Sequence, residues 1–124
     1  MLKSIVVAAV LLASVATPSV AQQTAPVVVV VKVFATPGRA DELQALYLNR
    51  LEYFRKAEPD STFRLHRSTK DTNVFLWYEV YPSEAAYENH VKVVNENYKK
   101  ETAPTPAGVI ARPSESETFR ELGR

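Results

Sequence analysis

The stretch VFLWYEVYPSE, residues 74–84, decides the fold of this chain. Its first eight residues are mostly aromatic or β-branched, a composition typical of a strand. Pro82 then stops the strand, Ser83 is a good N-cap for a helix, and Glu84 lies in the first turn, where the helix dipole favours an acidic side chain. The sequence therefore predicts a strand over residues 74–81 that is followed at once by a helix.

A further strand is predicted just before this one, and the helix after it is expected to run to about Lys100. Residues 62–67 alternate between polar and apolar side chains, and the polar residues 68–73 separate them from the strand at 74–81. This pattern is typical of a β-hairpin. After Ser83, apolar side chains return at helical spacing between Tyr87 and Val94, which predicts an amphipathic helix.

The N-terminal half of the mature chain predicts another strand and helix. Residues 27–34 (VVVVVKVF) are almost all β-branched and end before Thr36-Pro37-Gly38, which predicts a strand buried on both faces. From Leu43 to Ala57 apolar residues recur at helical spacing, and Pro59 ends the segment. These features predict a second amphipathic helix.

The C-terminal part has a less regular pattern. Residues 102–117 are a Pro-rich segment, in which we expect a loop and a helical turn near Val109, and only Thr118–Leu122 has the composition of a strand. We expect that strand at an edge of the sheet. The predicted order β-α-β-β-α-β is typical of the ferredoxin-like α+β fold, a four-stranded antiparallel sheet with two helices on one face.

The first 21 residues have the pattern of a secretory signal peptide. Lys3 gives a positive start, residues 5–16 are almost all apolar, and Ser19-Val20-Ala21 places small residues at the cleavage site. A membrane anchor is the alternative, but a spanning helix needs about 20 apolar residues. We therefore expect cleavage after Ala21, a periplasmic or secreted location, and one mature domain over residues 22–124.

Composition excludes several classes of function. Without Lys3 the chain has 14 Lys and Arg against 14 Asp and Glu, a balance that does not favour nucleic acid as a partner. No cysteine, only two histidines and only three glycines are present, so neither a metal motif nor a Gly-rich phosphate loop is predicted. No later segment is apolar enough to span a membrane. A site without a cofactor, or a simple binding site, remains.

Residues 64–68 and 74–90 resemble the central block of the antibiotic biosynthesis monooxygenase family. The chain also has the family's first strand and, at Pro37-Gly38, the family's Pro-Gly helix start. The similarity extends over Val28–Lys100. Its most specific element is a Glu late in the third strand, followed by a His on the next helix. Short patterns of this kind also describe related dimeric α+β barrels.

The resemblance implies a homodimer whose two sheets join as a barrel, with a pocket in each subunit between the sheet and its own helices. Members of the family include cofactor-free oxygenases of quinols and anthrones, and haem-degrading enzymes. The latter use an Asn, a Trp and a His at positions that here correspond to Val31, His90 and Lys100. Haem degradation is therefore disfavoured.

Glu79 and His90 are the candidate catalytic pair. Strand alternation places Phe75, Trp77 and Glu79 on one face, and the family pattern directs that face toward the helices. His90 shares the apolar stripe of its helix with Tyr87, so we expect the two side chains within hydrogen-bonding reach. A carboxylate beside an imidazole fixes the tautomer and raises the basicity of a general base. The alternative is a structural hydrogen bond between two half-buried groups.

Aromatic side chains are the candidates for binding a flat, apolar ligand. Filling of the core is the alternative role for each of them, and it is favoured for Phe54. Arg64 and His66 share a face of the second strand and are further candidates, although a strand histidine is more often on the surface. The predicted substrate-binding residues are Trp77, Phe75, His66, Arg64, Tyr87 and Tyr47.

Three functions follow from these expectations. The first is a cofactor-independent monooxygenase that uses molecular oxygen on a quinol-like or anthrone-like phenol. The second is a periplasmic dimer that binds a small molecule in the same pocket without turnover, because a fold does not fix a function. The third is a structural dimer whose pocket is filled by its own side chains. All three include a homodimer, because the sheet face opposite the helices would otherwise expose apolar side chains.

Overall fold

The computed structural model describes residues 13–14 and 24–123, so the predicted signal peptide lies almost wholly outside the described residues. The elements are β1 (Val27–Ala35), α2 (Ala40–Ala57), β2 (Thr62–Arg67), β3 (Val74–Tyr81), α3 (Glu84–Val93), a π-helical turn (Val94–Tyr98), α4 (Lys99–Glu101) and β4 (Ile110–Arg120). Their order confirms the predicted β-α-β-β-α-β arrangement of a ferredoxin-like α+β fold.

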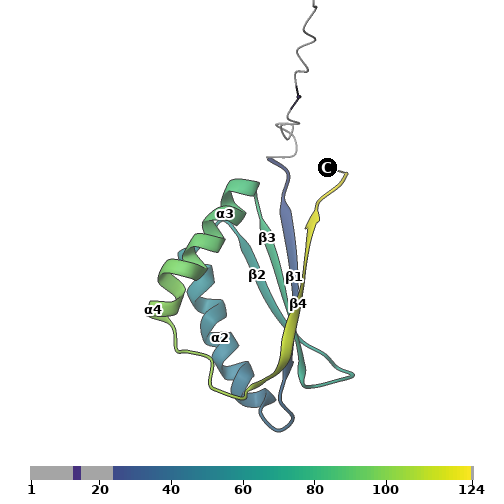
Figure 1. Ribbon diagram of the computed structural model, residues 1–124, viewed down its shortest axis with the longest axis vertical. Helices are drawn as coiled ribbons and strands as arrows, with labels where there is room; N and C mark the ends of the chain where they lie inside the picture. Colours follow the sequence, from purple (N-terminus) through teal and green to yellow (C-terminus); the bar gives the residue numbers. More distant parts are fainter. Residues whose placement is uncertain (1–12, 15–23, 124) are drawn as a thin grey trace, which may run out of the picture.

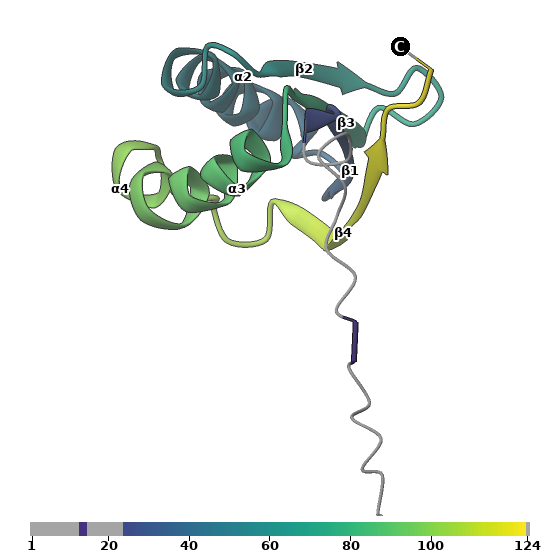
Figure 2. The same cartoon turned by 90° about the horizontal axis from the view of Figure 1, so that it is seen from above.

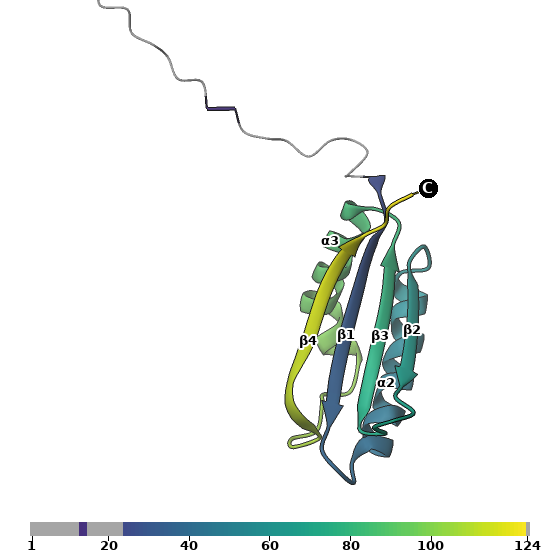
Figure 3. The same cartoon turned by 90° about the vertical axis from the view of Figure 1, so that its right-hand side faces the viewer.

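The four strands form one antiparallel sheet in the order β2-β3-β1-β4. Helices α2 and α3 both cover the same face, and the other face is open (Figure 1, Figure 2). Figure 3 shows β1 and β3 in the middle of the sheet, with β2 and β4 at its edges. The central position of β1 explains its composition, since β-branched residues pack well in a sheet.

The hydrophobic core lies between the sheet and its helices. Alternation along β1 buries Val27, Val29 and Val33 against the helices, while Val28 is half-buried and Lys32 is exposed on the open face. The prediction that this strand is buried on both faces is therefore wrong for the single chain. The largest fully buried side chains of the core are Tyr81, Phe63, Phe75, Leu43, Val27 and Val109.

The last strand is longer than predicted, since β4 begins at Ile110 rather than at Thr118. It pairs with β1 from Ala35 back to Val27, with register shifts near Phe34. Pairing with the long β1 extends the strand through residues 113–117, whose polar composition indicated a loop. An edge strand tolerates Pro113 because one of its sides makes no hydrogen bonds to another strand.

The loop before β4 is correspondingly shorter. It turns tightly at Gly108, which has a positive φ of 75°, in place of the predicted helical turn near Val109. Two side chains hold this turn: Thr36 Oγ1 donates to the Gly108 carbonyl at 2.5 Å, and Arg39 Nη1 donates to the Ala107 carbonyl at 2.6 Å. The start of β4 is thereby fixed beside the end of β1.

The helix after β3 begins as predicted, but it changes its geometry before it ends. Ser83 is the N-cap, and its Oγ accepts a hydrogen bond from the Ala86 amide at 3.2 Å. The α-helical part ends at Val93, and the π-helical turn follows it. Among the described residues, no helix has both the length and the apolar character needed to cross a bilayer.

Candidate active site

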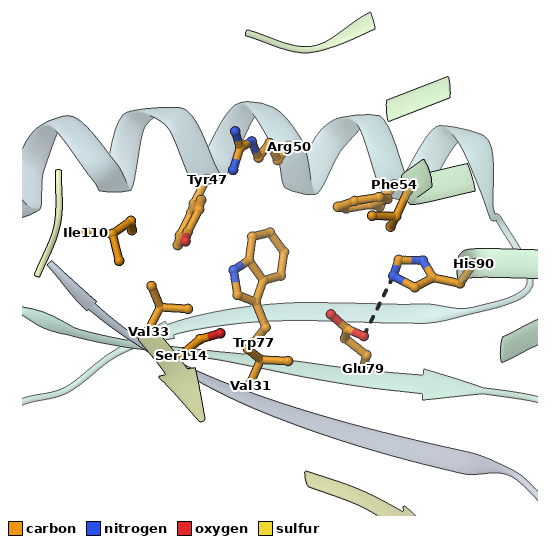
Figure 4. A pocket seen from close by; sticks show the side chains of 11 residues that line it. Val31, Val33, Tyr47, Arg50, Phe54, Trp77, Glu79, His90, Ile110 and Ser114 are labelled. Atoms are coloured by element: carbon orange, nitrogen blue, oxygen red, sulfur yellow. Dashed lines mark ion pairs between the residues drawn. The ribbon is translucent and has the colours of Figure 1, made fainter. Parts of the chain in front are cut away.

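A pocket of about 420 Å³ lies between the sheet and the helices, within the size range of about 300–1,000 Å³ for small-molecule sites. β1, α2, β3, α3 and the β4 region all contribute to its wall (Figure 4). Apolar side chains form most of the lining, and a few polar groups interrupt it. The lining residues are Val31, Val33, Tyr47, Arg50, Phe54, Trp77, Glu79, His90, Val94, Ile110 and Ser114.

Four of the predicted site residues meet at this pocket: Tyr47, Trp77, Glu79 and His90. Trp77 lies edge-on to Tyr47, with 5.3 Å between the ring centroids, and the two rings form an apolar wall. Figure 4 shows Glu79 and His90 to one side of Trp77. The period-two alternation of β3 brings Trp77 and Glu79 to the same face, as the sequence predicts.

Two other candidates lie beside the pocket rather than in its wall. Phe75 is 1% exposed and packs edge-on under Tyr47, with 6.0 Å between the centroids. Tyr87 packs against Tyr81 at 5.4 Å. Neither lines the pocket, so each fits the alternative reading of a core residue better than that of a ligand contact.

Arg64 and His66 are on the wrong face of the sheet to line this pocket. Phe63 is 2% exposed and points into the core, so alternation along β2 sends Arg64 and His66 to the open face, where both are exposed. The expectation that they line the pocket is corrected. The choice between the two faces of this short strand depends on Phe63, whose burial decides it.

The closest polar partner of His90 is Glu58, which the sequence analysis did not identify. His90 Nδ1 lies 2.7 Å from Glu58 Oε2, and both residues are buried. Glu58 is the C-cap of α2, a position where the helix dipole disfavours a carboxylate. An acidic residue at such a helix end, just before Pro59, was the one signal in the sequence that could have identified it.

Glu79 is farther from His90 than predicted. Its Oε2 lies 4.0 Å from His90 Nε2, which is too long for a hydrogen bond. The same oxygen accepts a hydrogen bond from the Tyr81 hydroxyl at 2.6 Å. The prediction of direct hydrogen-bonding reach is therefore wrong, although both side chains line the pocket.

The two ring nitrogens of His90 face different groups, Nδ1 toward Glu58 and Nε2 toward Glu79. When neutral His90 donates its Nδ1 proton to Glu58, the Nε2 lone pair remains, as in other carboxylate-oriented histidines. This nitrogen is on the side of Glu79 (Figure 4). Phe54, Phe63 and Tyr81 surround the ring at centroid distances of 5.1, 5.5 and 5.0 Å. The arrangement can accept a proton from a ligand in the pocket.

Burial, with a smaller contribution from the neighbouring Glu58 charge, raises the pKa of the Glu79 carboxyl, although the Tyr81 hydrogen bond and the charge of His90 act to lower it. Burial and the neighbouring Glu79 charge raise the pKa of the Tyr81 phenol. The phenol therefore stays protonated and continues to donate to Glu79. A carboxyl whose pKa is raised binds its proton more tightly in the folded chain than in the unfolded one.

This pKa shift predicts a pH-dependent stability. Between the pKa of Glu79 in the unfolded chain and its raised pKa in the folded chain, the folded state still holds a proton that the unfolded state has lost. The free energy of unfolding therefore falls as the pH rises through this range. We expect Glu79→Gln, which keeps an acceptor for Tyr81, to abolish this fall and to stabilise the protein at neutral pH. Urea unfolding at a series of pH values measures the free energy of unfolding of the wild type and of the variant.

Glu52→Gln is the matched control, because Glu52 is exposed on α2. It should leave the pH dependence as in the wild type. A free energy of unfolding for Glu79→Gln that falls with pH as steeply as that of the wild type would contradict the assigned role of the Glu79 carboxyl.

Arg50 also lies at the site, and unlike Glu58 it lines the pocket, although it was not among the predicted site residues. It is 8% exposed and comes from α2. Its Nη2 donates to Thr105 Oγ1 at 2.8 Å and to the Ala103 carbonyl at 3.2 Å, and its guanidinium lies 5.7 Å from the centre of the Tyr47 ring. Helical spacing places Arg50 beside Tyr47 and Phe54, so its position among apolar lining residues was the available signal.

The described residues contain no group of three or more His, Cys, Asp or Glu side chains arranged to hold a metal ion. The polar groups of the lining residues include an imidazole, a carboxyl group, a guanidinium, the Tyr47 and Ser114 hydroxyls and the Trp77 indole N–H. These groups can move a proton and can bind a polar substituent of a ligand.

Together, fold and site define a ferredoxin-like α+β protein with a small-molecule pocket between its sheet and its helices. The sequence profile described as "Antibiotic biosynthesis monooxygenase" matches residues 26–94. The chain belongs to this family. No curated protein matches the sequence significantly.

Solved structures show the same fold. A candidate antibiotic biosynthesis monooxygenase from Caulobacter crescentus superposes with a TM-score of 0.67 at 23% identity, covering 82% of this chain and 94% of its own. One from Nitrosomonas europaea gives 0.64 at 19% identity and covers 81% and 93%. At these identities the likeness shows the fold alone.

Proposed function

We propose that this protein is a cofactor-independent monooxygenase that acts with molecular oxygen on a quinol-like or anthrone-like phenol. The observation that carries the proposal is the position of His90, which is bound to buried Glu58 through Nδ1 and lines the pocket beside Trp77. A histidine oriented in this way has the geometry of a general base. Membership of the family supports the reaction class.

In the proposed reaction the protein supplies a base and a binding site for the aromatic ring. His90 Nε2 takes the phenolic proton, directly or through water, and the resulting anion is electron-rich enough to reduce oxygen itself. For an anthrone, one oxygen atom becomes the new carbonyl oxygen, and the other leaves as water with the two hydrogens of the carbon. The substrate therefore supplies all the electrons. Trp77 and Tyr47 hold the ring and keep bulk water away from the anion.

Binding without turnover is the second candidate function. The short bond between Glu58 Oε2 and His90 Nδ1, enclosed by three aromatic rings, also gives each of these two atoms a partner without any ligand. In that case the pocket would hold a small molecule that leaves unchanged.

Incubation of the purified chain with anthrone under ¹⁸O₂ distinguishes the two functions. We expect ¹⁸O in the product carbonyl, measured by mass spectrometry, at a rate above that of the protein-free reaction and without added flavin or metal. Absence of enzyme-dependent product across anthrones and quinols, with bound substrate demonstrated, would favour the binding protein.

We further propose a homodimer closed by the open sheet face. Val28, Val30, Leu76, Tyr78 and Val80 are half-buried on that face in the single chain, and Phe119 is 43% exposed. A group of partly exposed apolar side chains on one face is typical of an interaction surface. A second copy of the chain would cover it and form the barrel that the family resemblance implies.

Val30→Asp is expected to convert the dimer into monomers, because a buried unpaired charge at the interface costs several kcal/mol. Light scattering at micromolar concentration measures the mass. Leu48→Asp, which introduces the same charge at an exposed position of α2, should leave the dimer intact. A wild-type chain that is monomeric would contradict the proposed barrel.

We also propose that the chain is exported and cleaved after Ala21, on the basis of the apolar stretch and the small residues before this site. N-terminal sequencing of the protein recovered from a periplasmic fraction should begin at Gln22. A mature protein that begins at Met1 would contradict the proposal.

A further inference from the structure

Arg50 places a positive charge in the wall of the pocket at some distance from the proposed base. It lies on α2 between Tyr47 and Phe54, and it is 8% exposed. Figure 4 shows Arg50 above Trp77, and Glu79 and His90 to the right of the indole. Removal of a guanidinium from water is costly, so its place beside a ligand-sized cavity calls for a role.

Two hydrogen bonds fix this guanidinium in place. Both leave from Nη2, and they end on Thr105 Oγ1 and on the Ala103 carbonyl, in the loop that leads to β4. Because an arginine carries five N–H donors in a planar fork, it can keep such bonds and still meet a carboxylate. A side chain held in this way loses little further entropy when a ligand binds.

The part of the pocket around His90 has acidic side chains nearby rather than a basic one. Glu79 lines this end of the pocket, and Glu58 lies directly behind His90. Two carboxyl groups disfavour a carboxylate of the ligand at that end, where a phenolate forms only together with a protonated His90, whereas Arg50 favours a carboxylate at its own end. A ligand with one anionic group and one phenolic hydroxyl would therefore bind in a single orientation, with its ring against Trp77.

We propose that Arg50 binds a carboxylate of the ligand, so that the pocket takes an aromatic acid rather than a neutral aromatic compound. The assignment of the hydroxyl to His90 rests on the proposed function, but the assignment of the carboxylate to Arg50 does not. The acid enters with its carboxylate toward Arg50 on α2 and with its ring against Trp77.

Calorimetric titration of the full chain with 2-naphthoate and 2-naphthamide tests the proposal, because the two probes share a ring and differ in charge. At pH 7 we expect 2-naphthoate to bind about tenfold or more tightly, as a charge-assisted hydrogen bond predicts. Trp77, the only tryptophan of the chain, should lose fluorescence as either probe enters the pocket.

Arg50→Gln should remove the preference for the acid, and Arg50→Lys should retain part of it, because it keeps the charge without the planar fork. Lys70→Gln, at an exposed position of the β2–β3 turn, removes one charge outside the pocket and should leave the preference unchanged. Should Arg50→Gln fail to fold, the comparison of the two probes on the wild type and on Arg50→Lys still tests whether the preference for the acid depends on Arg50.

Equal affinity of the wild type for both probes, including no measurable binding of either, would overturn the inference, as would a preference for the acid that survives in Arg50→Gln. These outcomes differ from a failure of the proposed function. An acid preference that depends on Arg50, in a protein without oxygenation activity, would support the carboxylate site and reject the monooxygenase. Oxygenation that depends on His90, with equal binding of both probes, would support the monooxygenase and reject the carboxylate site.

Discussion

His90→Ala is expected to reduce the rate of oxygenation of an anthrone by about a hundredfold or more, the usual contribution of a positioned general base. The reason is that no other imidazole lines the pocket within the described residues. Enzyme-dependent product formation at saturating substrate, compared with the wild type, measures the effect. The same variant should lose about 1–3 kcal/mol of stability, since Glu58 keeps its burial but loses its hydrogen-bond partner.

His66→Ala is the matched control for this experiment. His66 is exposed on the open face of the single chain, beside Leu76 and away from the pocket, so its replacement, in a variant that light scattering shows to be dimeric, should change neither turnover nor the lining of the site. A His90→Ala protein that is folded and turns over at nearly the wild-type rate would assign the Glu58–His90 bond a purely structural role.

The largest loss of stability is expected from Phe63→Ala, at about 3–5 kcal/mol, the usual cost of truncating a buried phenylalanine. Phe63 is 2% exposed, and its ring stacks on Phe54 at 5.4 Å and meets Tyr81 edge-on at 5.9 Å. It also contacts His90 at 5.5 Å, so the cavity left behind would loosen the support of the proposed base. Urea unfolding, followed by circular dichroism, gives the change in free energy.

Leu122→Ala provides the comparison, because Leu122 is 88% exposed beyond the end of β4. Its effect should be within about 0.5 kcal/mol of zero, as for most surface substitutions. A loss below about 1 kcal/mol for Phe63→Ala would contradict the burial of Phe63 against the core, and with it the position of Arg64 and His66 on the open face.

Local patterns predicted the elements well. The β-branched run at residues 27–34, the helical period after Gly38 and the Pro82-Ser83-Glu84 boundary all describe elements that the structure contains. They succeed because alternation, helical spacing and capping are properties of neighbouring residues. The same local logic failed for β4, whose polar residues 113–117 are held as a strand by β1 and not by their own propensity.

The candidate site was predicted in part for the same reason. Trp77 and Glu79 share a face because they are two residues apart on one strand, and the helical stripe of His90 could be recognised from its apolar neighbours. The direction in which Arg64 and His66 point could not be recognised, since a strand of six residues offers two faces and only the packing of Phe63 distinguishes them.

The sequence by itself therefore determined the element order, the antiparallel α+β class and the face of β3 that carries Trp77 and Glu79. Only the tertiary structure decided that Glu58, 32 residues before His90, is its hydrogen-bond partner, and that Arg50 lies in the wall of the same pocket. Periodicity specifies which side of an element a residue occupies, but a contact between distant elements depends on how their helices and strands pack together, and no local pattern encodes that packing.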